Sequence, residues 1–468
     1  MMMDMHLKPI TKSPFGCLNL PGSKSIANRV LPLAAISHGE SIIHNIPSNS
    51  EDVGLMLKAL QNLGVEIVDI TDSCASFSAS SNNSIGTTIN SYAKTYKIIG
   101  CGGDFAIKNA LIFCGNSGTT IRFLTAILAL MPGQYCLDGI NRMHERPIKD
   151  LVVALQQIGA QIEYKLKDGY PPLQTNKFID NYVKVIKISG KISSQYLTGL
   201  LMALPLLQRE VTVQIIDELV SRPYVMITEA LLAKFGCGLI EQDNSYIINK
   251  DVINGGDTAI GERINNTDIQ SCQLTGINYT VEPDASSASY FLAMAAICGD
   301  IRINHLSKNS LQGDKNFADI LAQMGADVSY DSDSVWVKSK TPLNAIKVNM
   351  EDMPDVAMTI AVMALFAEGT TTITGIHSWK VKETDRLVAM YNELTKLGAD
   401  VTITDSSISI TPPQQITANV SIETYNDHRM AMCFSLVAVY GIPIIIKDYM
   451  CVGKTFPDYF DVFHSLCY

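Results

Sequence analysis

The sequence lacks the features that mark membrane proteins, disordered chains and metalloproteins. No uninterrupted apolar run reaches the roughly 18 residues that span a bilayer. Charged residues make up only 18% of the chain and hydrophobic residues 47%, which favours large packed cores over disorder. The eleven cysteines and eight histidines are scattered, without a Cys-x-x-Cys pair. We therefore expect reduced thiols, no disulfide framework and no metal site.

The chain also lacks an excess of basic residues and any targeting signal. Its net charge of −10 argues against general nucleic-acid binding, whose footprint is basic. The first 20 residues contain no apolar core and no small-residue cleavage site, so we expect a cytoplasmic protein without a signal peptide. Only ten arginines occur, and several lie beside Gly, Ser, Asn or Pro in short motifs. Such clusters in an acidic protein suggest a site for a small anion, and ordinary surface charges are the alternative.

Nucleotide-binding motifs are absent as well. The tripeptide Gly453-Lys454-Thr455 resembles the end of a Walker A loop, but the earlier glycine of that motif is replaced by Asp448. No Gly-x-Gly-x-x-Gly follows a predicted strand, so dinucleotide binding has no support.

An internal repeat organises the chain. Six segments begin with small polar or charged residues and continue into an Ala/Leu/Met-rich body that is apolar on nearly all faces. Each body predicts a buried helix, and each start has residues that cap helices. The six starts are Ser23-Lys24-Ser25, Asn116-Ser117-Gly118-Thr119, Ser193-Ser194-Gln195, Ser286-Ser287, Pro354-Asp355 and Asp427-His428-Arg429.

A second, more amphipathic helix alternates with the first and ends in glycine before a short strand, which is a typical C-cap signal. The distance from each helix start to its glycine is 39 to 43 residues, and the sixth pair would end near Cys467. We expect six α/β units of roughly 70 to 95 residues, grouped as two lobes of three. The polar segments 73–94 and 254–278 are interpreted as surface insertions. The closing glycines are Gly64, Gly159, Gly236, Gly325 and Gly398.

The helix starts suggest anion binding. Unpaired N–H groups and the positive end of the helix dipole favour anions, although the polar residues could serve only as caps. Capping is the preferred interpretation for Ser286-Ser287, which has no cation nearby. The other starts have neighbouring cations that suit phosphate or carboxylate: Lys24, Arg29, Arg122, Arg146, Lys382, Arg386, Arg429 and Lys454.

Five residues are candidate acids or bases. For Asp355, at a helix start in an apolar segment, spacing favours a capping role over a base. Helical spacing places Lys382 and Arg386 on one face at i, i+4, where a solvated charged face is the alternative to a site. The five candidates are Asp355, Glu383, Asp427, His428 and His144.

Ten segments, in order, resemble the EPSP synthase (3-phosphoshikimate 1-carboxyvinyltransferase) family over nearly the whole chain, from about Leu18 to Phe463. No single motif carries the resemblance. The segments are LNLPGSKSIANR, GNSGTTIRFL, RMHERPI, SSQYLTGLLMALPL, SRPY, VEPDASSASYFLA, PDVAMTIAVMALFA, SWKVKETDRL, YNDHRMAMCFSLVA and KTFPDYF.

The resemblance implies a two-lobed α/β fold with six βαβαββ units, three per lobe, and an active site between the lobes. One lobe would comprise residues 22–282, and a discontinuous lobe residues 1–21 plus 283–468. The crossings near Pro21-Gly22 and Glu282-Pro283 would act as hinges on which the lobes close.

The implied reaction transfers the enolpyruvyl group of phosphoenolpyruvate to the 5-hydroxyl of shikimate 3-phosphate by addition and elimination, in the shikimate pathway of aromatic amino acid biosynthesis. No cofactor is implied, and we expect a monomer. The resemblance implies Asp355, Glu383 and Lys24 as catalytic residues. Contacts to shikimate 3-phosphate would come from Lys24, Ser25, Arg29, Ser193, Ser194, Gln195, Ser221, Tyr224, Asp355 and Lys382. Contacts to phosphoenolpyruvate would come from Lys24, Gly118, Arg146, Gln195, Arg386, Arg429 and Lys454.

Three positions depart from the usual family pattern: Ser378 where Asn is common, Phe123 where Pro is frequent, and Pro283 where Gly is frequent. A shorter donor at Ser378 could act through water, and Phe123 could shift the start of its helix. Gly118 keeps the small residue that leaves room for phosphonate inhibitors, so we expect glyphosate to compete with phosphoenolpyruvate.

Three rival functions remain for comparison. A UDP-N-acetylglucosamine enolpyruvyl transferase would have a Cys in the loop before the Arg-Pro pair, and residues 139–146 contain none. An RNA 3′-terminal phosphate cyclase shares similar repeats, but the acidic charge disfavours it. A catalytically inactive anion-binding protein is opposed by the presence of Asp355, Glu383 and Lys24.

Overall fold

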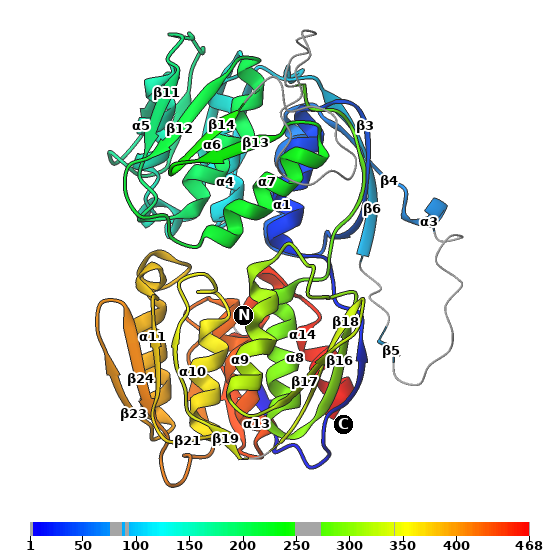
Figure 1. Ribbon diagram of the computed structural model, residues 1–468, viewed down its shortest axis with the longest axis vertical. Helices are drawn as coiled ribbons and strands as arrows, with labels where there is room; N and C mark the ends of the chain where they lie inside the picture. The colour runs from blue at the N-terminus through cyan, green and yellow to red at the C-terminus, as the bar shows by residue number, and fades with distance from the viewer. Residues whose placement is uncertain (1–2, 75–86, 89–92, 249–272, 341, 468) are drawn as a thin grey trace.

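The computed structural model describes residues 3–74, 87–88, 93–248, 273–340 and 342–467, and shows two lobes stacked along the long axis of the molecule (Figure 1). Both chain termini lie in the lower lobe. Most of the two predicted insertions, 73–94 and 254–278, lies outside the described residues. No helix in the described part of the chain is long and apolar enough to cross a membrane.

Five sheets share one topology, in which a parallel pair of strands is extended by two antiparallel strands. In β11-β12-β14-β13, for example, β11 (Val185–Ile188) runs parallel to β12 (Val211–Ile215), and both remaining strands are antiparallel to their neighbours. Helix α6 (Ser194–Ala203) connects the parallel strands, and α7 (Arg222–Lys234) follows. The order is βαβαββ. The last strands of this sheet are β13 (Leu239–Gln242) and β14 (Ser245–Ile248).

The same arrangement recurs along the chain, which confirms the predicted repeat. The four other sheets are β15-β3-β6-β4, β7-β8-β10-β9, β2-β16-β18-β17 (which β5 (Thr87–Thr88) extends beside β2) and β20-β22-β24-β23. Their strands are β2 (Phe15–Leu18), β3 (His38–Pro47), β4 (Glu66–Asp69), β6 (Ala93–Cys101), β7 (Asn109–Phe113), β8 (Gln134–Asp138), β9 (Ile162–Tyr164), β10 (Leu173–Thr175), β15 (Asn278–Thr280), β16 (Asp300–Asn304), β17 (Asp327–Tyr330), β18 (Ser334–Lys338), β20 (Lys347–Asn349), β22 (Thr371–Thr374), β23 (Asp400–Ile403) and β24 (Ser407–Thr411).

The sixth unit is completed by the N-terminus. Strand β1 (Met5–Leu7) pairs antiparallel with β26 (Ile444–Ile446), which is itself parallel to β25 (Val420–Ile422). The two ends of the chain therefore depend on each other for their hydrogen bonds, because a strand left at a sheet edge exposes unpaired backbone groups. A further small pair joins β19 (Leu343–Asn344) and β21 (Ala367–Glu368).

The six predicted buried helices are present, five of them at or within one residue of the expected start, whereas the fifth begins at Ala357, two residues after Asp355. They are α1 (Lys24–Ile36), α4 (Gly118–Ala129), α6, α8 (Ala285–Cys298), α10 (Ala357–Met363) and α12 (His428–Phe434), the last continued by α13 (Leu436–Val439). Their bodies are buried almost completely. This agrees with their composition, because a helix that is apolar all round finds a stable place only inside a core.

The amphipathic helices end as predicted. Each of the five closing glycines has a positive φ, between +87° and +104°, a conformation that glycine adopts without steric cost. The sixth of these helices ends at Cys467. The six helices are α2 (Glu51–Asn62), α5 (Lys149–Gln157), α7, α9 (Phe317–Gln323), α11 (Arg386–Lys396) and α14 (Tyr459–Cys467).

The buried apolar side chains form two separate cores. One contains residues between Ile26 and Val281, and the other contains Leu7, Leu18, Leu20 and residues between Ala285 and Cys467. Strand β2 accordingly pairs with β16 of the lower lobe, and β15 pairs with β3 of the upper lobe. One thiol expectation was wrong, because Cys237 is disulfide-bonded. Eight cysteines of the described chain are free: Cys17, Cys101, Cys114, Cys136, Cys298, Cys433, Cys451 and Cys467.

Two passages of the chain between the lobes, at Gly22 and at Pro283, pair with each other. Gly22 and Pro283 form an isolated antiparallel bridge, with Ser23 N donating to Glu282 O at 2.7 Å and Asp284 N donating to Pro21 O at 2.9 Å. Gly22 is packed so closely that a Cβ there would lie 1.9 Å from Asn45 O.

We predict that Gly22→Ala lowers the melting temperature by several degrees, because the added methyl group must force the passage away from the Asn45 carbonyl. An overpacked site costs about 1–3 kcal/mol. Differential scanning calorimetry should show no comparable loss for the control Gly453→Ala, whose Cβ would meet no heavy atom within 4 Å. Equal melting temperatures for Gly22→Ala and the wild type would contradict the close packing.

Candidate active site

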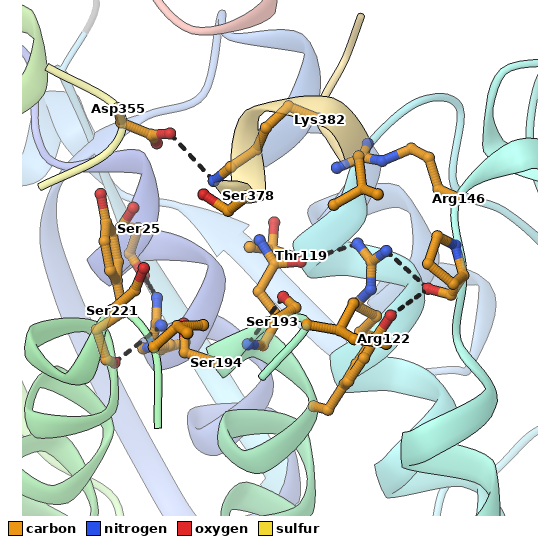
Figure 2. Close-up of a pocket in the computed structure, with 18 of the residues that line it drawn as sticks. Ser25, Thr119, Arg122, Arg146, Ser193, Ser194, Ser221, Asp355, Ser378 and Lys382 are labelled. Carbon is orange, nitrogen blue, oxygen red and sulfur yellow. Dashed lines mark hydrogen bonds and ion pairs between the residues drawn. The ribbon is translucent and has the colours of Figure 1, made fainter. Parts of the chain in front are cut away.

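A polar cavity lies between the two lobes, where helix starts from both of them meet (Figure 2). The upper lobe contributes residues from the starts of α1, α4, α6 and α7, and the lower lobe contributes Asp355, Ser378, Val381 and Lys382. All ten residues predicted to contact the acceptor line it: Lys24, Ser25, Arg29, Ser193, Ser194, Gln195, Ser221, Tyr224, Asp355 and Lys382.

The predicted donor contacts lie in and directly beside this cavity. Lys24, Arg146 and Gln195 line it. Gly118 opens α4 immediately behind it, since a Cβ there would lie 2.4 Å from Arg122 Nη1 and 2.7 Å from Arg146 Nη2. Arg386, Arg429 and the predicted catalytic Glu383 belong to one buried ionic network that adjoins it, and Lys454 belongs to a second.

Asp355 is the carboxylate on which the lower-lobe cations converge. Its Oδ1 accepts from Lys382 Nζ at 3.2 Å and Arg386 Nη1 at 3.0 Å, and its Oδ2 accepts from Arg429 Nη2 at 2.9 Å. Although burial opposes ionisation, the surrounding cations hold the pKa of Asp355 well below its ordinary value. The carboxyl is therefore ionised and can accept a proton.

This geometry corrects two expectations. The sequence favoured Asp355 as a helix cap, but α10 begins only at Ala357 and Asp355 makes no capping bond; the three cations compete for it more strongly than a backbone N–H does. Lys382 and Arg386 were expected on one helical face, but Lys382 precedes α11, which begins at Arg386. The two cations meet at Asp355 through the loop instead.

Arg386 links three carboxylates and is almost completely buried. Its Nε donates to Asp427 Oδ2 at 2.7 Å, and its Nη2 donates to Glu383 Oε2 at 2.9 Å, in addition to the bond to Asp355. Burial raises the pKa of Glu383, but Arg386 and the nearby Arg146 outweigh it and keep the pKa well below the ordinary value. A planar guanidinium with several donors suits such a branched arrangement.

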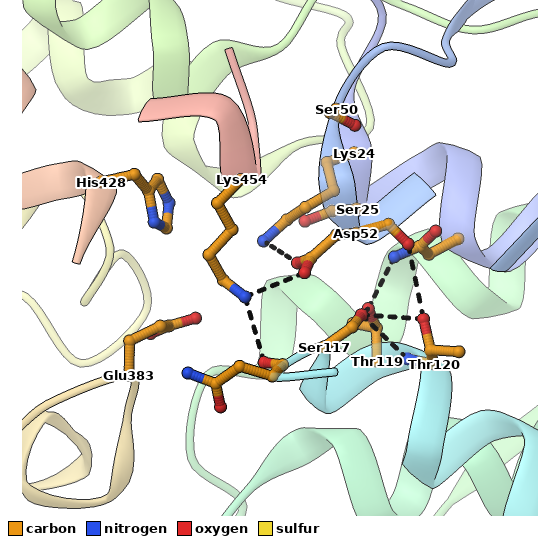
Figure 3. A network of polar contacts seen from close by, with 12 residues as sticks. Lys24, Ser25, Ser50, Asp52, Ser117, Thr119, Thr120, Glu383, His428 and Lys454 are labelled. Carbon is orange, nitrogen blue, oxygen red and sulfur yellow. Dashed lines mark hydrogen bonds and ion pairs between the residues drawn. The ribbon is translucent and has the colours of Figure 1, made fainter. Parts of the chain in front are cut away.

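A second ionic centre joins the lobes around Asp52 (Figure 3). Asp52 is 2% exposed. Its carboxylate pairs with Lys454 Nζ from the lower lobe at 2.9 Å and with Lys24 Nζ from the upper lobe at 3.2 Å. Lys454 also donates to Asn116 O at 3.0 Å. Sequence reasoning missed Asp52, because an acidic residue in the first turn of a helix is normally interpreted as a response to the helix dipole.

Two further sets of contacts across the cleft, from Arg142 and Ser221, were also not predicted from the sequence. Arg142 donates from the upper lobe to the carbonyl oxygens of Glu383 at 3.1 Å and Lys382 at 3.0 Å. Ser221 Oγ donates to Glu351 O at 3.1 Å. These bonds hold the lower-lobe loop against the cavity. Arg142, the first arginine of the RMHERP segment, was the available signal in the sequence, but nothing in its spacing indicated a partner more than 200 residues away.

Three buried arginines in the cavity have no carboxylate partner within the described part of the chain. Arg29 donates to Thr228 Oγ1 and two carbonyls, Arg122 to Gln195 Oε1 and a carbonyl, and Arg146 to Asn116. These residues are 1 to 4% exposed. Burial lowers the pKa of Arg29 and Arg146 to about 10. Buried cations are costly unless paired, so the arrangement favours an anion from outside the chain.

The remaining candidates have other surroundings. His428 is buried, and its pKa is held well below the ordinary value chiefly by burial. Neither ring nitrogen forms a hydrogen bond among the described residues, although Nδ1 lies 3.5 Å from Asp427 Oδ1. His144 lies outside the cavity, with Nε2 2.8 Å from Asp138 Oδ1. Ser378 Oγ lines the cavity and is also unpartnered in the described chain.

Phe123 and Pro283, two of the three residues that depart from the usual family pattern, leave the starts of α4 and α8 intact. The start of α4 is regular, because Ser117 Oγ accepts from Thr120 N, and Phe123 packs beneath the Arg29 guanidinium at 5.2 Å from ring centroid to Cζ. The start of α8 is capped by Asp284 rather than Ser286. Ser286 instead donates its hydroxyl to Asp314.

Comparison with known proteins identifies the family of this chain. A model of EPSP synthase (3-phosphoshikimate 1-carboxyvinyltransferase) matches residues 11–463. The chain belongs to the EPSP synthase family. It is 44% identical over 470 residues to the 3-phosphoshikimate 1-carboxyvinyltransferase of Burkholderia orbicola, covering 97% of both chains, and 45% identical over 457 residues to that of Nitrosomonas europaea, covering 96% of both.

Solved structures support the fold of the EPSP synthase family. The chain aligns with EPSP synthase from Acinetobacter baumannii with a TM-score of 0.75 at 24% identity, covering 100% of this chain and 98% of the other. The enolpyruvyl transferase NikO from Streptomyces tendae aligns with a TM-score of 0.71 at 14% identity, with the same coverage. The two-lobed enolpyruvyl transferase fold is thereby confirmed.

We predict that Arg386→Ala lowers the free energy of unfolding at pH 7 by roughly 3–5 kcal/mol, because it leaves buried carboxylates without their cation. The pKa values of Asp355 and Glu383 are lower in the folded state than their ordinary values of 3.8 and 4.5. Their ionised carboxylates therefore stabilise the fold at a pH above those ordinary values, and this stabilisation is lost as the pH falls through the lower, folded-state values. The difference between variant and wild type should therefore shrink below pH 4.5.

Urea unfolding between pH 7 and pH 3.5 measures this difference. Lys380→Ala is the control, because its partner Asp405 is almost fully exposed and such a pair contributes less than about 1 kcal/mol. A difference for Arg386→Ala that stays constant down to pH 3.5 would show that the carboxylates are not the source of the effect.

Proposed function

We propose that this enzyme transfers the enolpyruvyl group of phosphoenolpyruvate to the 5-hydroxyl of shikimate 3-phosphate, releasing phosphate. The family membership supports the reaction. The observation that carries it to this chain is the cavity with three buried arginines that have no carboxylate partner in the described residues, together with Lys24 and Lys382. Two phosphates and a carboxylate are the anions that such a site would bind.

The two substrates are assigned to different sides of the site. We assign shikimate 3-phosphate to the part lined by the starts of α1, α6 and α7, where Arg29 and the serines lie. Phosphoenolpyruvate is assigned to the part near Gly118, where Arg146, Arg386, Arg429 and Lys454 supply cations. Hydroxyl and amide groups at helix starts can donate to the substrate oxygens in addition to the cations.

The reaction proceeds by addition and elimination. The 5-hydroxyl oxygen bonds to C2 of phosphoenolpyruvate as it loses its proton to a base, and C3 gains a proton. The tetrahedral intermediate then loses phosphate from C2 while C3 returns a proton, which restores the double bond. The cations stabilise the charge that develops during both steps, and their effect is largest when closed lobes exclude water.

Asp355 is the proposed base for the hydroxyl. It lines the cavity beside the acceptor-binding residues, and its depressed pKa keeps it as a carboxylate. Lys24, paired with Asp52 at 3.2 Å, is the proposed source of the proton that C3 gains in the addition step. Glu383 is the proposed base that takes a proton back from C3 in the elimination step, because it lies on the donor side beside Arg386 and its depressed pKa keeps it ionised.

The lobe boundaries at 21/22 and 282/283 are proposed as hinges. The separate cores and the paired passages at Gly22 and Pro283 support this division. The substrates would bring the two lobes together by pairing with the unneutralised arginines of the upper lobe and with groups of the lower lobe. A monomer with only these small anionic partners, in the cytoplasm, remains the expectation.

The direct test mixes the protein with shikimate 3-phosphate and phosphoenolpyruvate and measures phosphate release. We expect release that requires both substrates and forms 5-enolpyruvylshikimate 3-phosphate, identified by mass spectrometry. UDP-N-acetylglucosamine serves as the alternative acceptor. Phosphate release with that acceptor, and none with shikimate 3-phosphate, would overturn the proposed function.

Asp355→Ala should lower kcat by about 10²–10⁴-fold, because a positioned general base contributes an effect of that size. Circular dichroism and the melting temperature check that the fold is retained. The neighbouring exposed Asp352 offers a matched control, and Asp352→Ala should keep near-normal turnover. Near-normal turnover of Asp355→Ala would exclude its proposed role as base.

Gly118→Ala should raise the KM for phosphoenolpyruvate by roughly tenfold and weaken inhibition by glyphosate, because the new methyl group must displace Arg122 and Arg146 or occupy the donor site. In the wild type, glyphosate should compete with phosphoenolpyruvate below millimolar concentration. Gly54→Ala is the control, since its Cβ would make only an ordinary contact at 3.6 Å. Unchanged inhibition of Gly118→Ala would place the phosphonate site elsewhere.

A further inference from the structure

A buried carboxylate that lies outside the cavity touches one of the residues that line it. Asp314 belongs to the short 3-10 helix η4 (Gly313–Asn316) of the lower lobe and is 5% exposed. Both of its carboxylate oxygens lie 3.4 Å from the hydroxyl oxygen of Tyr224, which belongs to α7 of the upper lobe. Asp314 Oδ2 also accepts the hydroxyl of Ser286. The contact with Tyr224 therefore bridges the two lobes.

The backbone around Asp314 is fitted against the same helix. A Cβ added to the preceding Gly313 would lie 2.5 Å from Cβ of Pro223, in the first turn of α7. Only a residue without a side chain allows η4 to approach α7 this closely. The contact between Asp314 and Tyr224 is thus part of a close packing of the two elements, and not an isolated approach of two long side chains.

The electrostatic surroundings of Asp314 are unfavourable for a purely structural carboxylate. In the described part of the chain it forms no ion pair. Burial raises its pKa to about 6, with further raising by Asp355 and Asp284 and opposing effects of Ser286 and Arg429. A buried carboxylate that lacks a cation costs stability, and such groups are concentrated at functional sites.

Tyr224 is the part of this pair that faces the substrate side. It lines the cavity, and its carbonyl oxygen accepts from Arg29 Nη2 at 3.0 Å. Burial, with the neighbouring Asp314 and Asp355 carboxylates, raises the pKa of the Tyr224 hydroxyl well above its ordinary value, so the hydroxyl stays protonated and acts as a donor. Its hydrogen can be directed to Asp314, which leaves its oxygen lone pairs for a donor on the cavity side.

We propose that Asp314 is a positioning residue that orients the Tyr224 hydroxyl for the acceptor substrate when the two lobes are together. Asp314 accepts the Tyr224 hydrogen, Ser286 holds the carboxylate in place, and Gly313 permits the approach. Because the lower lobe supplies the carboxylate and the upper lobe the tyrosine, the acceptor site is complete only in the closed arrangement. This role rests on the proposed function, which identifies the acceptor.

A double-mutant cycle on the KM for shikimate 3-phosphate tests the role. Asp314→Ala and Tyr224→Phe should each raise this KM by about tenfold, the loss of one hydrogen bond, and the double variant should also be raised by only about tenfold. Asp314→Asn keeps an uncharged acceptor and should show about a threefold rise. The KM for phosphoenolpyruvate and kcat should change by less than about threefold.

Asp319→Asn is the matched control, because Asp319 accepts the hydroxyl of Tyr330 at 2.9 Å on the exposed side of α9. Its KM values should equal those of the wild type. If Asp314→Ala does not fold, the cycle is run with Asp314→Asn and Tyr224→Phe, where the double variant should match Tyr224→Phe alone.

The outcomes separate this role from the proposed function. If the wild type releases no phosphate from the two substrates, the proposed function itself is wrong. An active wild type whose single effects multiply to about a hundredfold in the double variant shows that Asp314 does not act through Tyr224. An unchanged acceptor KM in Asp314→Ala likewise overturns the positioning role while leaving the reaction intact.

Discussion

The pairing of buried charge at Asp355 and Arg386 is the constraint on which the site depends. Taking a charged group out of water costs several kcal/mol, and only partners at hydrogen-bond distance offset that cost. The cost of burying Arg386 is offset by its ion pairs with Asp355, Glu383 and Asp427. The cost of burying Asp355 is offset by its ion pairs with Lys382, Arg386 and Arg429. These pairs fix the starts of α10, α11 and α12 relative to one another.

The upper half of the site is organised differently. Arg29, Arg122 and Arg146 are held by hydroxyls, amides and carbonyls, which orient them without neutralising them. The upper lobe therefore presents positive charge, and the lower lobe presents a nearly compensated network with an ionised carboxylate. This asymmetry suits a reaction in which anionic substrates must be bound and a hydroxyl proton must be removed in the same cavity.

The helix starts show how one structural unit serves two purposes. Ser117, Ser193, Asp284 and Asp427 cap their helices with side-chain oxygens. Residues one or two positions further along are then free to line the cavity, as Gln195 does, or to lie directly beside it, as Gly118 and Arg429 do. Where the polar residue itself is needed in the site, as with Asp355, the helix begins later and is left without that cap. Capping and binding thus compete for the same few positions, and local charge decides between them.

The sequence by itself determined the repeat, the buried helices, the glycines that close the amphipathic helices, and most of the residues around the cavity. The first three follow from local rules, which are apolar periodicity and the conformational freedom of glycine, whereas most of the cavity residues were implied by the resemblance of their motifs to those of the family. Only the tertiary structure decided the partners of Asp52, Arg142 and Asp314, and whether Asp355 caps a helix or meets cations. Those outcomes depend on which charges from distant segments are brought within hydrogen-bond distance once water has been excluded, and no spacing along the chain records that distance.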